Sequence, residues 1–210
     1  MPHDTIASLQ ARLDAAERRA EQAYSRGAVE NVFNSYMHLH NAFEDEQIKN
    51  LWVPEGTPGI RAQYSNNGVY TSWSSVMKYH SDRPRPIGKL LLHYTTTPVI
   101  EVADDCQTAK GFWTMTGLES GLSDPANVGI MPEFMFEAPE KSVNGKRVWT
   151  HWVWCNYSVE FLRQADGSWK IWHFRCLEIA RCPYSENWIT FAAKNKIAFE
   201  KASEATGDHL

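Results

Sequence analysis

Apolar residues at helical spacing mark the first quarter of the chain. Asp4 or Thr5 can cap a first helix, which is expected to end near Gly27. Its apolar positions recur every three or four residues, as an amphipathic helix requires. They are Ile6, Leu9, Leu13 and Ala16.

A second helix is predicted to begin at Val29 and to continue to Trp52, where a Pro-Glu-Gly segment stops it. The apolar stripe of this helix carries polar exceptions. It consists of Val32, Phe33, Tyr36, Leu39, His40 and Phe43. Residues 72–80 are expected to form a short third helix, and the proline-rich segment 83–86 then imposes a loop.

From Leu90 onward the pattern becomes the alternation typical of strands. Four strands are expected, over residues 90–103, 108–120, 147–164 and 168–182. Asp166-Gly167 between the last two is a strong hairpin signal. A final helix is predicted over 184–205, with Trp188 and Phe191 as its anchors.

Helices followed by a long antiparallel meander indicate an α+β fold. We expect N-terminal helices packed on one face of a curved β-sheet, with an extra C-terminal helix. The boundaries are an N-terminal helix over 1–28, a main domain over 29–182, and a C-terminal helix and tail over 183–210. Aromatic residues alternate onto both faces of the third strand, so the outer face is predicted to be covered by self-association as a dimer or trimer.

Composition and charge argue against several classes of binding partner. The formal net charge is -4, and lysine and arginine do not cluster, which argues against nucleic acid. The sequence has no apolar run of about 20 residues, so no membrane span is expected and the protein is predicted to be cytoplasmic. The four cysteines have no zinc spacing, and no histidine and carboxylate cluster suggests a metal; we expect no metal and no cofactor.

Three segments resemble the nuclear transport factor 2-like superfamily, and in particular its SnoaL-like branch. They are the run 93–103, the segment 108–113 with Gly111 and Trp113, and the run 166–174. The branch includes polyketide cyclases, scytalone dehydratase, bile acid dehydratase and hexachlorocyclohexane dehydrochlorinase. The resemblance implies a cone-shaped, curved mixed β-sheet wrapped around a long helix and assembled as a dimer or trimer. It also implies cofactor-free proton transfer, elimination, isomerisation or cyclisation on a hydrophobic ring compound.

The same resemblance implies a catalytic acid or base at His93, at the start of the first long strand. Lyase members also carry a tyrosine on the second helix, here Tyr36, and an aspartate five residues later. That position is Asn41 in this chain. Asn41 cannot take a proton, so it can only orient His93 or bind substrate. Glu44 could supply the absent carboxylate, although the acidic run 44–46 favours a solvated surface position for it.

Other candidates come from the strands and from the second helix. His173 and Arg175 alternate on the last long strand, where Arg175 could stabilise a developing oxyanion or could pair with Glu101 or Glu160. Trp113 could stack on an aromatic substrate or could simply pack in the core. His40 lies on the apolar side of its helix and remains a substrate-binding candidate.

These residues predict a cofactor-independent lyase, either a dehydratase or a formaldehyde-eliminating enzyme, acting on a small hydrophobic aromatic or polycyclic substrate. His93 would move the proton, and Tyr36, Glu44 and Arg175 would handle the oxygen that gains or loses charge. An isomerase or cyclase would use the same chemistry. A non-catalytic module that binds hydrophobic ligands is the alternative from another functional class.

Overall fold

The computed structural model describes residues 5–64, 68–81, 89–123, 136–137, 142–186 and 189. Helical segments come first and four long strands follow, as the sequence pattern predicts. The elements are α1 (Ile6–Asn41), α2 (Asp45–Ile48), the 3-10 helix η1 (Lys49–Leu51), β1 (Arg61–Tyr64), β2 (Val69–Tyr70), α3 (Trp73–Ser81), β3 (Leu90–Val102), β4 (Thr108–Ser123), β5 (Arg147–Arg163) and β6 (Trp169–Pro183).

The first two predicted helices are one continuous helix, so the expected break near Gly27 is wrong. Thr5 caps α1 by accepting a hydrogen bond from the backbone N–H of Ser8 at 3.3 Å. Gly27 lies in the helix interior, where a Cβ atom added to it would have nothing within 4 Å. A single interior glycine costs only about 1 kcal/mol relative to alanine, which good helix formers on both sides can offset.

The same helix ends before Trp52, at Asn41. Phe43 takes a left-handed backbone conformation, with φ of 60°, which stops the α-helix. Two short helical pieces, α2 and η1, then lead to the strands. The expected helix over 72–80 is confirmed as α3, whereas the short strands β1 and β2 were not predicted.

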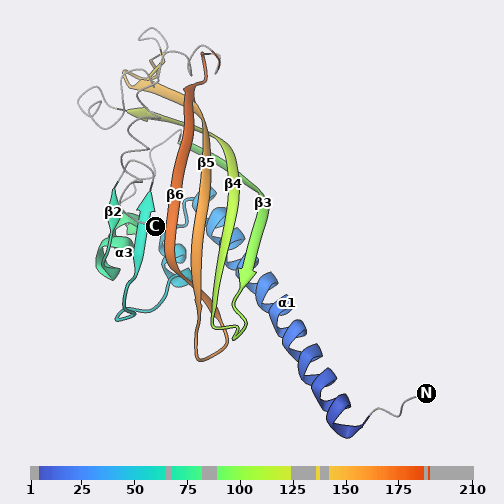
Figure 1. The fold of residues 1–210 in the computed structure, drawn as a ribbon. Helices are drawn as coiled ribbons and strands as arrows, with labels where there is room; N and C mark the ends of the chain where they lie inside the picture. The colour runs from blue at the N-terminus through green and yellow to red at the C-terminus, as the bar shows by residue number, and fades with distance from the viewer. Residues whose placement is uncertain are drawn as a thin grey trace.

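The six strands form one curved mixed sheet in the order β2-β1-β6-β5-β4-β3. The four long strands are antiparallel neighbours, and β1 runs parallel to β6. The hairpin between β5 and β6 turns at Gly167, with φ of 85°, as the Asp-Gly pair predicted. β3 is therefore an edge strand of the long meander, beside α1 (Figure 1).

Alternation along the strands separates an inner face, which packs on α1, from an outer face. On β5 the buried inner positions include Trp149, His151, Val153, Cys155 and Tyr157, as the sequence predicted. Phe33 of α1 stacks on Trp113 of β4, with ring centroids 3.9 Å apart. The curved sheet around a long helix confirms the predicted α+β cone.

The outer face carries exposed aromatic and aliphatic side chains. They include Tyr94, Val99, Phe112 and Ile179. This surface agrees with the expected self-association, which stays a prediction. The predicted C-terminal helix falls almost entirely outside the described residues. Among the helices that the structure describes, none is long and apolar enough to cross a membrane.

Candidate active site

His93 lies on the inner face of β3, near the beginning of that strand, and is 6% exposed. It faces Gly117 on β4. A Cβ atom at position 117 would come within 2.8 Å of Cδ2 of His93 and within 2.5 Å of the Leu92 carbonyl oxygen. The glycine therefore allows the imidazole ring to pack directly over the backbone of β4.

Asn41, the last residue of α1, fixes the backbone of His93. Its Nδ2 donates to the His93 carbonyl oxygen at 3.0 Å, and its Oδ1 accepts from the His93 backbone N–H at 3.1 Å. The amide thus supplies a donor and an acceptor to an edge strand, as a neighbouring strand would. Of the two roles considered for Asn41, this geometry favours the orientation of His93.

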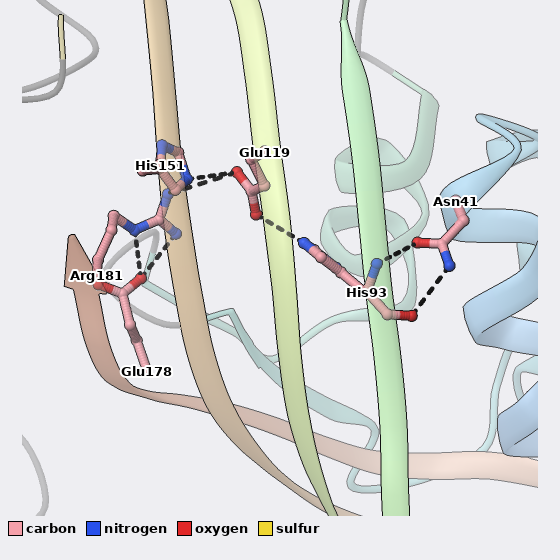
Figure 2. A network of polar contacts seen from close by, with 6 residues as sticks. All are labelled: Asn41, His93, Glu119, His151, Glu178 and Arg181. Carbon is pink, nitrogen blue, oxygen red and sulfur yellow. Dashed lines mark hydrogen bonds and ion pairs between the residues drawn. The ribbon is translucent and has the colours of Figure 1, made fainter. Parts of the chain in front are cut away.

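Glu119 on β4 provides the carboxylate that the helix lacks. Its Oε1 lies 2.8 Å from Nε2 of His93, and its Oε2 lies 3.0 Å from Nε2 of His151 on β5. Figure 2 shows this carboxylate between the two imidazole rings. Glu119 pairs directly with His151 across the β4–β5 ladder, and Leu91, two residues before His93, is its partner on β3. The pairing of the three strands therefore places the side chains of His93, Glu119 and His151 on the same face of the sheet.

The network continues to β6 through Arg181 and Glu178 (Figure 2). Nη1 of Arg181 lies 3.4 Å from Oε2 of Glu119 and also contacts Nε2 of His151. Nε and Nη2 of Arg181 lie 2.9 and 2.7 Å from Oε2 of Glu178. Two carboxylates therefore share one guanidinium at the inner face of the sheet.

A β-bulge makes the Glu178–Arg181 contact possible. Residues three apart on a regular strand point to opposite faces. Here Glu178 pairs with Cys155 and Ala180 with Trp154, which leaves Ile179 as the extra residue. The bulge turns Glu178 and Arg181 onto the same face.

Electrostatics keep Glu119 ionised. Burial would raise the pKa of its carboxyl group, but hydrogen bonds from His151 and His93 and the charge of Arg181 outweigh burial and hold this pKa well below its usual range. Burial, assisted by Arg181, lowers the pKa of His151, although Glu119 opposes the shift. The site therefore contains a permanent carboxylate beside a histidine that resists protonation.

The contact with Glu119 also fixes the tautomer of a neutral His93. An ionised carboxylate only accepts, so Nε2 of His93 carries the hydrogen and Nδ1 keeps the lone pair. Nδ1 is buried and has no hydrogen-bond partner in the described part of the chain. The lone pair on Nδ1 of His93 therefore accepts no hydrogen bond within the described part of the chain, and Nδ1 of His151 is in the same state.

Tyr36 and His40 of α1 extend the site towards the core. The His40 ring lies 5.0 Å from the His93 ring, between centroids, and stacks on Tyr36 at 5.9 Å. Tyr36 is 2% exposed. The structure thus gathers several of the residues singled out in the sequence: His93, Asn41, His40 and Tyr36.

The other candidates lie elsewhere. Glu44 is half-buried just before α2, and its carboxylate accepts a hydrogen bond from Gln47 at 3.2 Å. The carboxylate that contacts His93 belongs to Glu119. The pairing of β3 with β4 places it there, and the periodicity of the helix has no part in this. Trp113 precedes Gly117 on β4. It is buried against Phe33 and so occupies the core.

Arg175 and His173 lie on the outer face, opposite to His93. Cys176 pairs with Tyr157 on the buried inner face, so alternation directs Arg175 outward beside Ser158. His173 contacts Glu160, and its Nε2 lies 2.8 Å from the Gly59 carbonyl oxygen. Glu101 pairs with Lys110 at 3.2 Å. Neither His173 nor Arg175 joins the His93 network.

Sequence reasoning missed Glu119, His151 and Arg181. The alternation of β5 did place His151 on the inner face, which was a usable signal. Among the described residues, no group of three or more histidine, cysteine or acidic side chains is arranged to hold a metal ion. A surface hollow of about 360 Å³ is lined by Trp52, Trp73 and Lys170, away from this network, so the aromatic pocket around His93 stays a prediction.

The chain is similar to known proteins in both sequence family and fold. A family model described as a SnoaL-like domain matches residues 21–175. No curated protein matches the chain. Similar solved structures include a hexachlorocyclohexane dehydrochlorinase, LinA type 2, with a TM-score of 0.57 and 13% identity over 80% of this chain and 95% of that one.

Two further structures show the same fold. The LinA type 3 enzyme of Novosphingobium barchaimii has a TM-score of 0.56 and 14% identity, covering 80% of this chain and 96% of that one. A protein assigned as a scytalone dehydratase, from Novosphingobium aromaticivorans, has a TM-score of 0.52 and 14% identity, covering 77% and 88%. Because the family model spans well over half of the sequence, this chain belongs to the SnoaL-like domain family, with a nuclear transport factor 2-like fold.

Proposed function

We propose that this protein is a cofactor-independent lyase in which His93, oriented by Glu119, removes a proton from a small hydrophobic substrate. One observation carries the proposal: an ionised buried carboxylate bonds one nitrogen of His93, and the other nitrogen is buried without a partner among the described residues. A base positioned by a carboxylate is the arrangement that general base catalysis requires.

The reaction would proceed by elimination. Nδ1 of His93 accepts the proton from a carbon next to the leaving group, the C–H electron pair forms the new double bond, and the leaving group departs with its own bonding pair. The ionised Glu119 stabilises the imidazolium that forms. His151 and Arg181 hold Glu119 in place from its other oxygen. The imidazolium can then return its proton to the leaving oxygen, if that group is a hydroxide.

The proposed substrate is an aromatic or polycyclic compound. Aromatic rings adjoin His93 on the α1 side, through His40 and Tyr36, and Trp149 stacks on His151 with ring centroids 5.4 Å apart. Such rings favour flat apolar ligands. One similar structure is a dehydrochlorinase and another is assigned as a dehydratase, and both of these reactions are eliminations. Loss of water or of formaldehyde fits the same base.

Replacement of His93 tests the proposal. A panel of hydroxylated bicyclic ketones, hydroxymethyl-bearing diaryl compounds and chlorinated cyclohexanes would be assayed for release of water, formaldehyde or chloride. With a substrate identified, His93→Ala should lower kcat/KM by about two to four orders of magnitude. His38→Ala is the matched control, because His38 is an exposed histidine on the same helix as Asn41.

Glu119→Gln separates orientation from chemistry. It keeps the size of the side chain but can place its donor, instead of an acceptor, against Nε2 of His93, so turnover should fall while the fold persists. Full activity of His93→Ala would overturn the proposal. Tight binding of panel compounds without turnover in the parent protein would instead favour a module that only binds hydrophobic ligands.

A further inference from the structure

The first half of α1 is a helix without a core to pack on. Residues 6–24 are mostly exposed, and the first buried side chain of α1 is Ser25. Figure 1 shows this part of the helix running away from the sheet, past the end of β3. We call residues 6–24 the N-terminal extension. Most of the stability of a helix in a protein comes from packing of its apolar face, so a partner surface would stabilise this extension.

The extension exposes one apolar stripe with a seven-residue repeat. Ile6, Leu9 and Leu13 are 87%, 50% and 51% exposed. If Ile6 takes position a of a heptad, the a and d positions as far as residue 23 are all apolar. They are Ile6, Leu9, Leu13, Ala16, Ala20 and Ala23.

The opposite side of the extension is tied to its own domain. Glu21 pairs with Arg163 at 2.7 Å, and Gln22 donates to Asp104 at 3.4 Å. Glu21 and Gln22 occupy heptad positions b and c, on the side away from the a and d stripe. The domain therefore holds the helix by one side and presents the apolar stripe outward.

The residues that flank the stripe have complementary charges for a parallel pair. Arg12 and Arg19 fall at position g, and Glu17 falls at position e. In a parallel two-stranded coiled coil, each g residue faces the e residue of the next heptad in the partner helix. Arg12 would then face Glu17 of a second copy, and Arg19 would face the ring of Tyr24. An antiparallel pair would instead oppose Arg12 and Arg19 across the g positions.

We propose that the N-terminal extension pairs in parallel with that of a second copy of this chain, along the stripe from Ile6 to Ala23. The interface is separate from the outer face of the sheet and from the His93 network. The first heptad, with Ile6 at a and Leu9 at d, has the pattern that favours two strands rather than three. Short a and d alanines bring the two helices close together near the domains.

A cysteine at an a position tests the pairing. Position 13 faces its own counterpart only in a parallel pair, so mild oxidation of Leu13→Cys should give a disulfide-linked dimer as the main product on a non-reducing gel. Ala11→Cys, at the outward f position of the same helical turn, is the matched control and should remain monomeric on the gel. The native cysteines are free and buried, so they interfere little. Equal cross-linking at both positions, or none, would overturn the proposal.

Charge reversal gives a second, independent readout. In the Leu13→Cys background, Arg12→Glu should reduce the cross-linked fraction several-fold, and adding Glu17→Arg should restore it. Sedimentation of the otherwise unchanged full chain should show a species of two copies that Leu9→Asp weakens. Failure of the double reversal to restore cross-linking, or trimers in which Leu9→Asp has no effect, would contradict a parallel pair. Circular dichroism of each variant verifies that the domain still folds.

Discussion

At the scale of single residues, this chain has an amide on α1 where the resembling lyases have a carboxylate, and its carboxylate comes from β4 instead. The lyase pattern places the carboxylate on the helix, where this chain has Asn41. Asn41 uses both polar atoms on the backbone of His93, while Glu119 from the neighbouring strand reaches the ring. A helix carboxylate at position 41 could not donate to the His93 carbonyl oxygen. The amide therefore anchors the strand, and the carboxylate contacts the imidazole ring of His93.

Gly117→Ala should impair catalysis without removing any chemical group. The added methyl group would meet the Leu92 carbonyl oxygen and Cδ2 of His93 at distances that real Cβ atoms do not adopt, so β3 or the ring must move. A displacement near 1 Å can reduce turnover by about a hundredfold. Steady-state kinetics and thermal unfolding of the variant would be compared. Unchanged kcat/KM would show that the ring position over β4 is not needed.

At the scale of elements, the four long strands were predictable, whereas β1, β2 and the registers of the sheet were not. Alternation gives the faces of β5 from residues close in sequence, and it assigned His151 correctly to the inner face. Contact between His93 and Glu119 depends on which residue of β4 lies opposite each residue of β3, which no local pattern fixes. The bulge at Ile179 brings Glu178 and Arg181 together, and no pattern of apolar residues in the sequence marks its position.

The helix error has a similar physical origin. Gly27 was interpreted as a terminator because glycine often ends helices, but it continues one here. A glycine terminates a helix when its backbone takes a positive φ, and Gly27 does not. Sequence pattern identifies the residue that permits a break, and the helix propensity of the residues on either side decides whether the break occurs.

Gly27→Ala should therefore stabilise the protein. Position 27 is helical, and an added Cβ has open space around it, so the alanine gains helix propensity without a clash. The free energy of unfolding should rise by about 0.5–1 kcal/mol. Urea unfolding followed by circular dichroism measures it. A loss of stability would indicate that α1 bends or opens at this position.

At the scale of the whole molecule, the site exists only when the meander is complete. Its side chains come from α1, β3, β4, β5 and β6, and they form one connected set of polar contacts on a mostly apolar inner face. Folding therefore largely buries two carboxylates and a guanidinium together, with side chains that stay 16% exposed for Glu119 and Glu178 and 23% exposed for Arg181. Removing Arg181 would leave Glu178 without its cation, and unpairing a largely buried charge costs far more than a surface ion pair contributes.

This burial also couples stability to pH through His151. Its pKa is lowered in the folded protein by burial and by Arg181, so the unfolded chain binds a proton at this residue at a higher pH than the folded one does. The unfolded state is favoured as pH falls below the ordinary histidine value of about 6.5, and stability rises again with pH up to that value. The contribution to the slope can reach about 1.4 kcal/mol per pH unit.

Urea unfolding of the parent and of His151→Asn at about pH 7.5 and about pH 5.5, on either side of the ordinary histidine pKa, measures this coupling. The parent should lose more stability than the variant on acidification, because the variant has no proton to bind at position 151 in either state. The exposed His38 supplies the control, since His38→Asn should keep the parent's pH dependence. The carboxyl group of Glu119, whose pKa is lowered, acts in a separate and more acidic window, with stability lost as pH falls below about 4.5. If the parent and His151→Asn lost equal amounts of unfolding free energy over this pH interval, His151 would bind a proton equally well in the folded and unfolded states.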